Sequence, residues 1–206
     1  MVGVLEGWHA MSETTYDDLL ARVRELVATT EGRVPVVGIT GHGGAGKSTL
    51  AERLAADLGL EEDQVVATDA FYATTCGPDA GMWEQCDWPL LEAVVRGART
   101  GSERLRYDYR WWGGETGTED HPMPPVLVVE GIRLLNDRTD AWFDLAVWIE
   151  MDPDAAGARA KSRNLLQGDD RAELDLWDTK WIPEGHAYEQ QERPRERADL
   201  VLRAEG

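Results

Sequence analysis

Apolar residues recur along the chain with two different spacings, and the two spacings alternate. Residues 12–30 carry leucines and valines three or four positions apart, as on one face of a helix. Residues 34–39 form a short, continuous apolar run rich in β-branched side chains, which is typical of a strand buried on both faces. Residues 47–58 return to helical spacing and are followed by Gly59, a residue common at helix ends.

The same alternation continues to the end of the chain. Further strands are predicted at residues 65–68, 126–129, 145–149 and 200–202. Further helices are predicted at residues 90–96 (ending at Gly97), 153–166 and 174–191, the last with an interruption at Pro183. Apolar strands that alternate with helices predict an α/β fold, in which a mainly parallel sheet carries helices on both faces in three layers.

The length of 206 residues fits one domain, so we expect residues 1–206 to fold as a single unit. Within it, residues 1–11 are predicted to be a flexible tail or an alternative start, because Met11 opens a more conventional beginning. Residues 70–122 form an excursion from this alternation: residues 70–88 are loop-like, and residues 99–122 are polar and aromatic, which indicates a hairpin or an irregular segment. No apolar stretch approaches the roughly 20 residues that span a bilayer, and the N-terminus lacks the pattern of a secretory signal.

A formal net charge of −18 argues against binding to a nucleic acid polymer, whose affinity depends on neutralised phosphates. A local loop or a cation can still hold a small phosphorylated ligand. The two cysteines, Cys76 and Cys86, make neither a disulfide framework nor a metal-ligand pattern. We therefore expect a protein of the reduced cytoplasm without a membrane partner, and leave a homo-oligomer open.

One motif carries strong chemical information. The sequence GHGGAGKS at residues 41–48 fits G-x-x-x-x-G-K-[ST], the phosphate-binding P-loop, and lies between a predicted strand and a predicted helix. Its backbone amides and the helix N-terminus would surround an anion. The predicted phosphate-binding residues are Gly41, Gly43, Gly44, Ala45, Gly46, Lys47, Ser48 and Thr49. Lys47 would reach the β- and γ-phosphates, and the Ser48 hydroxyl would ligate Mg²⁺.

A P-loop alone does not choose between a GTPase, a motor and a kinase. The Asn-Lys-x-Asp motif that Ras-like GTPases use for guanine is absent from the sequence, and the chain is short for a motor. A kinase needs a carboxylate that accepts the proton of the acceptor hydroxyl. Asp69 follows the strand at residues 65–68, and parallel strands bring their carboxyl ends to one edge, so Asp69 is expected to face Lys47. A helix cap is its ordinary alternative.

Two further carboxylates are candidates. Glu130 ends the strand VLVVEG and could hold Mg²⁺ or polarise the attacking hydroxyl, and Gly131 after it favours a close approach of backbone. Asp87 precedes a predicted helix. It could cap that helix or accept hydrogen bonds from sugar-like hydroxyls, and the spacing does not separate the two roles.

Several short motifs occur along the chain in an order that resembles a known protein family. GHGGAGKST, TDAFY, CDWP, YDY, VVEGI and ERPRERADLVL, spread over residues 34–203, are together similar to the uridine kinase-like group of P-loop kinases, which includes phosphoribulokinase and bacterial pantothenate kinase types. The resemblance implies that Asp69 is the base toward the acceptor hydroxyl and that Asp87 holds ribose hydroxyls. Uridine kinases have Asp-His-Pro where this chain has Asp87-Trp88-Pro89, so the acceptor stays open.

The resemblance also implies a lid over the triphosphate, expected here at residues 159–175. Arg159 and Arg163 share one helix face and are its candidate arginines, with surface ion pairs as the alternative. On the acceptor side, Tyr107, Arg110 and Trp112 are predicted to line a pocket that stacks a flat or apolar acceptor. Trp83, Trp88, Trp111 and Trp112 could instead form a small satellite core. His42 is expected to be structural or to face solvent.

These observations predict an enzyme that needs ATP and Mg²⁺ and transfers the γ-phosphoryl group to a hydroxyl of a small molecule. Asp69, Lys47 and Arg163 would be the catalytic residues, and Ser48 and Glu130 the metal ligands. A uridine-like nucleoside is the first candidate acceptor, and a sugar or a pantothenate-like compound the second. A nucleotide-binding or ATPase protein without acceptor chemistry is the alternative class, and GTP is not excluded as the donor.

Overall fold

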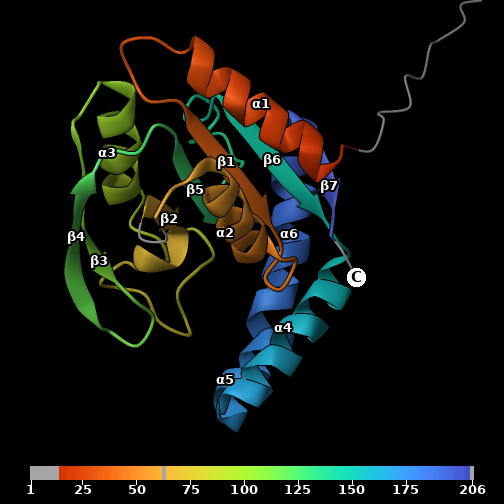
Figure 1. Cartoon of the computed structure of the whole chain (residues 1–206). Coiled ribbons are helices and arrows are strands. Elements are labelled where there is room, and N and C mark those ends of the chain that lie inside the picture. The colour runs from red at the N-terminus through yellow and green to blue at the C-terminus, as the bar shows by residue number, and fades with distance from the viewer. Residues whose placement is uncertain (1–13, 62–63, 205–206) are drawn as a thin grey trace, which may run out of the picture.

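The computed structural model describes residues 14–61 and 64–204, and a five-stranded parallel sheet forms its centre (Figure 1). The strands lie in the order β2 (Val65–Ala67), β5 (Leu127–Gly131), β1 (Val36–Gly41), β6 (Leu145–Glu150) and β7 (Leu200–Arg203), and each neighbouring pair is parallel. Strands β1 and β5 are buried along their whole length, which explains their continuous apolar sequence. The tail predicted at residues 1–11 lies outside the described residues.

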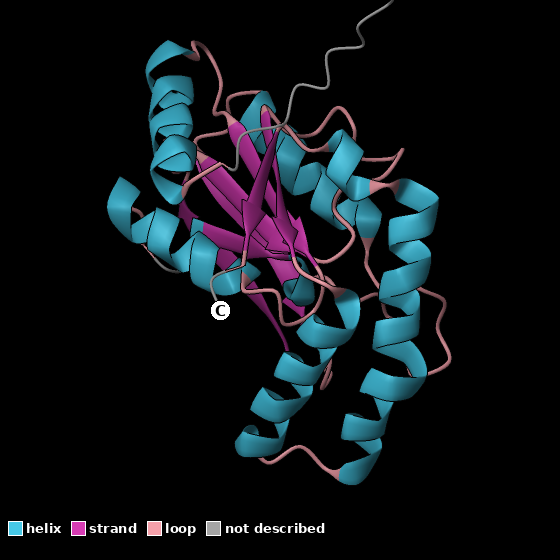
Figure 2. Ribbon diagram, turned by 90° about the vertical axis from the view of Figure 1, so that its right-hand side faces the viewer, coloured by secondary structure: helices cyan, strands magenta, loops and turns pink. Residues whose placement is uncertain are grey.

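Helices cover both faces of the sheet, as the alternation of elements predicts (Figure 2). On one face, α1 (Tyr16–Thr29) and α2 (Lys47–Leu58) pack with the side chains of Val37 and Ile39. On the other face, α3 (Trp88–Arg99) packs with Val36, the neighbour of Val37. Because successive strand residues point to opposite faces, β1 contributes to two separate cores.

The excursion predicted at residues 70–122 contains regular structure. After the 3₁₀ turn η2 (Thr68–Ala70), it holds α3 and a hairpin of β3 (Arg104–Arg110) and β4 (Thr116–Pro122), which form their own antiparallel sheet. The predicted end of the helix at Gly97 was wrong. Gly97 lies inside α3, because the apolar face continues with the fully buried Ala98, and the chain turns only at Gly101, where φ is +77°.

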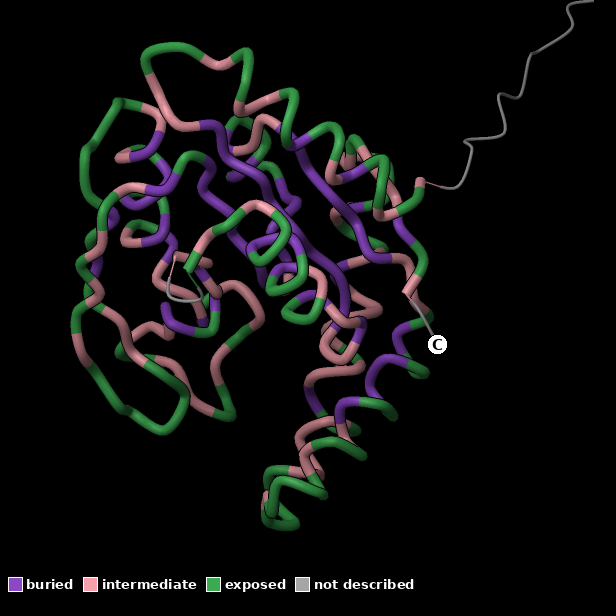
Figure 3. The backbone as a smooth tube through the Cα atoms, viewed as in Figure 1, coloured by how far each residue is buried: buried purple, intermediate pink, exposed green. Residues whose placement is uncertain are grey.

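A helical arm leaves the body of the domain beside the sheet (Figure 2). It consists of α4 (Pro153–Gln167), α5 (Arg171–Leu176), the π-helical turn η3 (Trp177–Trp181) and α6 (Ile182–Glu192), and the short α7 (Pro194–Arg197) leads back to β7. The central strands β1, β5 and β6 are buried, whereas the tip of the arm is exposed (Figure 3).

The predicted interruption of the last helical region does occur, but it precedes Pro183. Pro183 lies in the first turn of α6, where its missing N–H costs no hydrogen bond, and the irregular turn is η3. Among the described residues, no helix has the length and apolar character needed to cross a membrane.

Candidate functional site

The loop between β1 and α2 has a backbone that only glycine fits at two positions. Gly44 has φ of +90°, and a Cβ there would lie 2.1 Å from the carbonyl oxygen of Ala156. Gly46 has φ of +96° and is the N-cap of α2. A side chain at Gly44 would therefore both strain the backbone and collide with α4. The glycines bring the loop close to the arm and leave α2 pointing its N-terminus toward the site.

A cavity of about 270 Å³ lies between this loop, the carboxyl ends of the strands and the helical arm. It brings together residues that are far apart in the sequence. The predicted site residues that line it are Gly41, Gly43, Gly44, Lys47, Ser48, Asp69, Trp112, Glu130 and Arg163. The sheet order explains this arrangement, because β5, which ends in Glu130, lies between β2 before Asp69 and β1 before the loop.

Lys47, Ser48 and Glu130 form the polar centre of the cavity. Nζ of Lys47 donates a hydrogen bond of 3.1 Å to the carbonyl oxygen of His42, within the loop. The Ser48 hydroxyl donates one of 3.1 Å to Oε1 of Glu130. Burial lowers the pKa of Lys47, and the nearby carboxylates of Glu130 and Asp69 oppose that effect. Burial raises the pKa of Glu130, and the positive charge of Lys47 opposes that increase.

An exposed carboxylate, that of Asp69, lies beside this centre. Asp69 lies in η2, directly after β2, and its side chain lines the cavity together with Lys47. Among the described residues, no side chain donates a hydrogen bond to Asp69, so its oxygens are available to a ligand. The helix-cap alternative does not apply, since Ala67 rather than Asp69 is the N-cap of η2.

Other predicted residues lie elsewhere. Asp87 is the N-cap of α3, and its Oδ1 accepts a hydrogen bond of 3.1 Å from the amide of Leu90. Tyr107 is buried against Phe71 in the core, and the backbone carbonyl of Arg110 accepts a hydrogen bond from the Tyr72 amide. None of the three lines the cavity. Asp87 therefore has the capping role that the spacing left open.

The remaining loop residues also differ in their placement. The Ala45 amide donates to the carbonyl oxygen of His42, so it is used inside the loop. Thr49 is exposed on α2 and does not line the cavity. His42 has the predicted structural character. Its ring is 6% exposed and packs edge-on against Trp148, with a centroid distance of 5.2 Å.

The two candidate arginines of the arm differ in their position relative to the cavity. Arg163 lines the cavity, and its guanidinium donates to Oδ1 of Asn164 at 3.1 and 3.2 Å. Asn164 in turn donates to Asp169, which also lines the cavity, at 2.7 Å. Arg159 is exposed and does not line it. Gly168, within the segment predicted to form the lid, is the left-handed C-cap of α4 with φ of +96°.

Aromatic rings form the wall of the cavity on the hairpin side. Trp112 from the hairpin lies between Tyr72 and Trp181, with centroid distances of 5.4 and 5.7 Å and steep interplanar angles. A Cβ at Gly43 would lie 2.8 Å from the ring of Trp177, which places that ring against the P-loop. Trp88 is buried in the same core cluster as Val36 and Leu127, and its indole N–H donates to the Trp83 carbonyl, so it belongs to the core beneath the sheet rather than to a separate satellite core.

Sequence reasoning missed several of these residues. It did not predict Trp177 and Trp181 as site residues, although the π-helical turn directs both toward the cavity. It also overlooked Tyr72, although Tyr72 ends the motif TDAFY, and the buried Arg133, three residues after Glu130. The proximity of Tyr72 and Arg133 to recognised motifs was the available signal; nothing local predicted the π turn.

Comparisons with known proteins agree with this geometry. A family model described as the methylmalonyl Co-A mutase-associated GTPase MeaB matches residues 2–77, which include the P-loop and Asp69. The uridine kinase of Lactobacillus helveticus (strain DPC 4571) is 26% identical over 150 residues, which is 64% of this chain and 68% of that protein. The uridine kinase of Latilactobacillus sakei subsp. sakei (strain 23K) is 26% identical over 152 residues, 66% of this chain and 70% of that protein.

Two solved structures, each designated a kinase only provisionally, have the same fold as this chain. A fructose transport system kinase from Silicibacter sp. TM1040 has a TM-score of 0.73 and 22% identity, covering 92% of this chain and 99% of its own. A uridine kinase from Bacillus stearothermophilus has a TM-score of 0.54 and 20% identity, covering 90% and 99%. The chain thus has the α/β fold of P-loop kinases, and its resemblance to the uridine kinase-like group is supported by sequence and structure alike.

Proposed function

We propose that this protein is a phosphotransferase that uses Mg²⁺ and a nucleoside triphosphate, with ATP as the expected donor, and phosphorylates a hydroxyl of a small metabolite. One observation carries the proposal: the Asp69 carboxylate, without a side-chain donor, lines the same cavity as Lys47 and the glycine loop. Phosphoryl transfer to a hydroxyl requires a group that accepts the hydroxyl proton, and binding of a nucleotide alone does not.

The donor would lie along the P-loop. Loop amides and the N-terminus of α2 would hold its phosphates, and Lys47 and Arg163 would neutralise charge on the transferred group. The oxygen pair of Ser48 and Glu130 suits Mg²⁺, which prefers a few protein oxygens together with phosphate and water. Bound there, the metal would supply Lewis-acid stabilisation of the phosphate oxygens.

The acceptor would enter from the side of Trp112 and Tyr72. Its hydroxyl would give its proton to Asp69 while the hydroxyl oxygen forms a bond to the γ-phosphorus. The bond between that phosphorus and the oxygen that bridges to the β-phosphate would break, and the diphosphate would leave with the electron pair. The base would then return the proton to solvent.

A uridine-like nucleoside is the first candidate acceptor, because its flat base could lie against the rings of Trp112, Tyr72 and Trp181. The curated relatives named uridine kinases support this choice. A sugar or pantothenate-like acceptor is the second candidate, and the relative named a fructose transport system kinase supports that one.

The test is acceptor-dependent release of nucleoside diphosphate by the purified full chain with Mg²⁺. Nucleosides, sugars and hydroxy acids would each be tried with ATP and with GTP, since a GTPase family model matches the P-loop region. Phosphorylation of one acceptor class supports the proposal. Release that is the same with and without every acceptor would instead identify a simple nucleotidase or binding protein.

A further inference from the structure

A buried ion cluster underlies the acceptor side of the cavity. Arg133 donates from Nη2 to Oε2 of Glu184 at 2.6 Å, and Nζ of Lys180 lies 3.1 Å from Oε1 of the same carboxylate. The three side chains are 6%, 17% and 10% exposed, in the order Arg133, Glu184 and Lys180. They come from the loop after β5 and from η3 and α6 of the arm, so the cluster joins the sheet edge to the arm.

The cluster is not electrically balanced by its own members. Two cations, Arg133 and Lys180, share the single carboxylate of Glu184, which leaves one positive charge. Among the described residues, the other hydrogen-bond partners of the cluster are neutral, namely the carbonyls of Met82 and Ala80 and the side-chain amide of Gln85. A buried charge without a full counter-charge is costly unless another group compensates it.

Arg133 is the member of the cluster that reaches the cavity. It lines the main cavity beside Tyr72, whereas Lys180 does not. Its recorded bonds from Nη1 and Nη2 go to three acceptors, while a guanidinium has five N–H donors. Among the described residues, two of those donors have no recorded partner.

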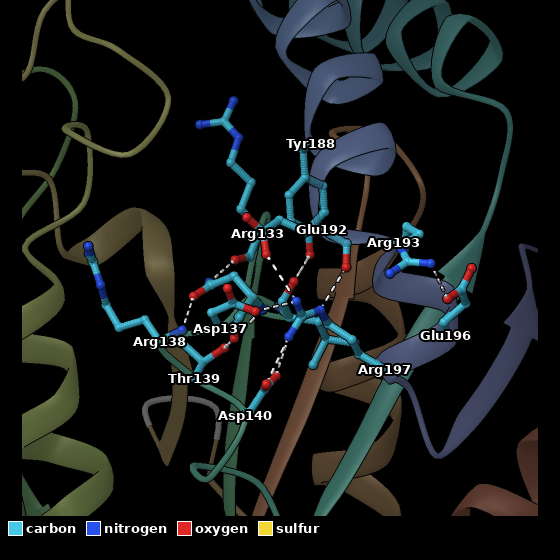
Figure 4. A network of polar contacts seen from close by, with 12 residues as sticks. Arg133, Asp137, Arg138, Thr139, Asp140, Tyr188, Glu192, Arg193, Glu196 and Arg197 are labelled. Atoms are coloured by element: carbon cyan, nitrogen blue, oxygen red, sulfur yellow. Dashed lines mark hydrogen bonds and ion pairs between the residues drawn. The ribbon is translucent and has the colours of Figure 1, made fainter.

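The backbone at Arg133 is also unusual. Its φ is +61°, one of two non-glycine residues with positive φ among the described residues. Such a conformation costs free energy and persists where the surroundings hold it, which is common at ligand sites. Here it follows Glu130 by three residues and directs the guanidinium toward the buried cluster. Figure 4 shows this side chain pointing away from the neighbouring cluster of Arg197, Asp137 and Asp140.

We propose that Arg133 is a specificity-determining residue, which binds a carbonyl or carboxylate oxygen of the acceptor molecule, while Glu184 and Lys180 position its guanidinium. The inference rests on the proposed kinase function and adds to it a chemical requirement: the acceptor bears such an oxygen, placed to reach Arg133 while its reacting hydroxyl faces Asp69. A uracil base and a hydroxy acid both carry such an oxygen, and a simple polyol does not.

The experiment compares matched acceptors in wild type and in Arg133→Lys, which keeps the charge but loses the planar fork. The pairs are uridine with ribose, and glycerate with glycerol. In wild type, the carbonyl- or carboxylate-bearing member should have the higher kcat/KM. In Arg133→Lys, its KM should rise roughly ten- to a hundredfold, whereas the KM of the nucleotide should change less than about twofold.

Arg197→Lys is the matched control. Arg197 donates hydrogen bonds to Asp137, Asp140 and the Glu192 carbonyl, and it lies outside the cavity. Its replacement by lysine should therefore lower thermal stability without changing the preference between acceptors. A higher kcat/KM for uridine than for ribose would identify a neutral carbonyl as the group that Arg133 binds. A higher kcat/KM for glycerate than for glycerol would identify a carboxylate.

The inference is overturned if Arg133→Lys raises nucleotide and acceptor KM equally, or leaves the preference within each pair unchanged. If no acceptor is phosphorylated by wild type, the proposed function fails, and calorimetric binding of the same pairs still tests Arg133. Preferential binding that Arg133→Lys abolishes would support the role, and equal binding, or no binding to either member, would contradict it.

Discussion

The Ser48 hydroxyl on α2 and the Glu130 carboxylate at the end of β5 are joined by a hydrogen bond of 3.1 Å, although 82 residues separate them in the sequence. The pair connects the phosphate loop with the neighbouring strand and presents two oxygens to one point of the cavity. Glu130 is 8% exposed, so a cation there would also offset the cost of its burial.

We expect Ser48→Ala to raise the Mg²⁺ concentration for half-maximal activity by about tenfold or more, because it removes one metal ligand and the donor that orients Glu130. The measurement is a Mg²⁺ titration of acceptor-dependent diphosphate release at saturating nucleotide. Ser162→Ala, which removes an exposed hydroxyl on α4, is the control. An unchanged Mg²⁺ requirement in Ser48→Ala would remove Ser48 from the metal site.

His42 should make stability depend on pH. Burial, assisted by repulsion from Lys47, lowers the pKa of its imidazole from 6.5 to about 4. Between these values the unfolded chain binds a proton that the folded chain excludes, so stability falls as pH drops through this window. The loss approaches about 3 kcal/mol near pH 4.

The variant His42→Phe keeps a ring against Trp148 and has no titratable nitrogen, and it also removes the buried Nε2 that has no hydrogen-bond partner. Urea unfolding without nucleotide, at pH 7.5 and pH 5, should show a smaller pH effect in the variant than in wild type. An equal pH effect in both proteins would assign the dependence to other groups.

The sequence did not distinguish the role of Trp112 from that of Trp88, but the structure predicts different effects when each is substituted. Trp112 lies on the cavity wall and is 37% exposed, so Trp112→Ala should raise the acceptor KM far more than the nucleotide KM. Trp88 is 5% exposed in the core, so Trp88→Ala should lower the free energy of unfolding by about 3–5 kcal/mol. Steady-state kinetics and urea unfolding of both variants check this, and the reverse pattern would contradict the placement.

The sequence predicted the framework of the site well, because local chemistry determines it. A strand, a glycine loop and a helix at residues 36–58 follow from periodicity and from backbone conformations that glycine alone adopts freely. Asp69 and Glu130 follow from a general property of parallel sheets, whose carboxyl ends meet at one edge.

The acceptor side was predicted less well, since it depends on contacts between distant segments. Trp181 reaches Trp112 only because η3 adds a π turn, and Arg133 is held by Glu184, which lies 51 positions away in the chain. Asp87 differs from Trp181 and Arg133, because its contact is with a residue nearby in the sequence. Its local capping role was among the alternatives, and only the three-dimensional arrangement separated that role from ligand binding.

The central claim is that Asp69 accepts the proton of the acceptor hydroxyl. The variant Asp69→Asn keeps the shape of the side chain but removes the basic oxygen. With the full chain, Mg²⁺ and the best acceptor of the panel, kcat should fall by about a hundredfold or more, while calorimetry should give nucleotide affinity within about threefold of wild type. A variant that transfers phosphate at the wild-type rate, or one that loses nucleotide binding together with activity, would contradict this account.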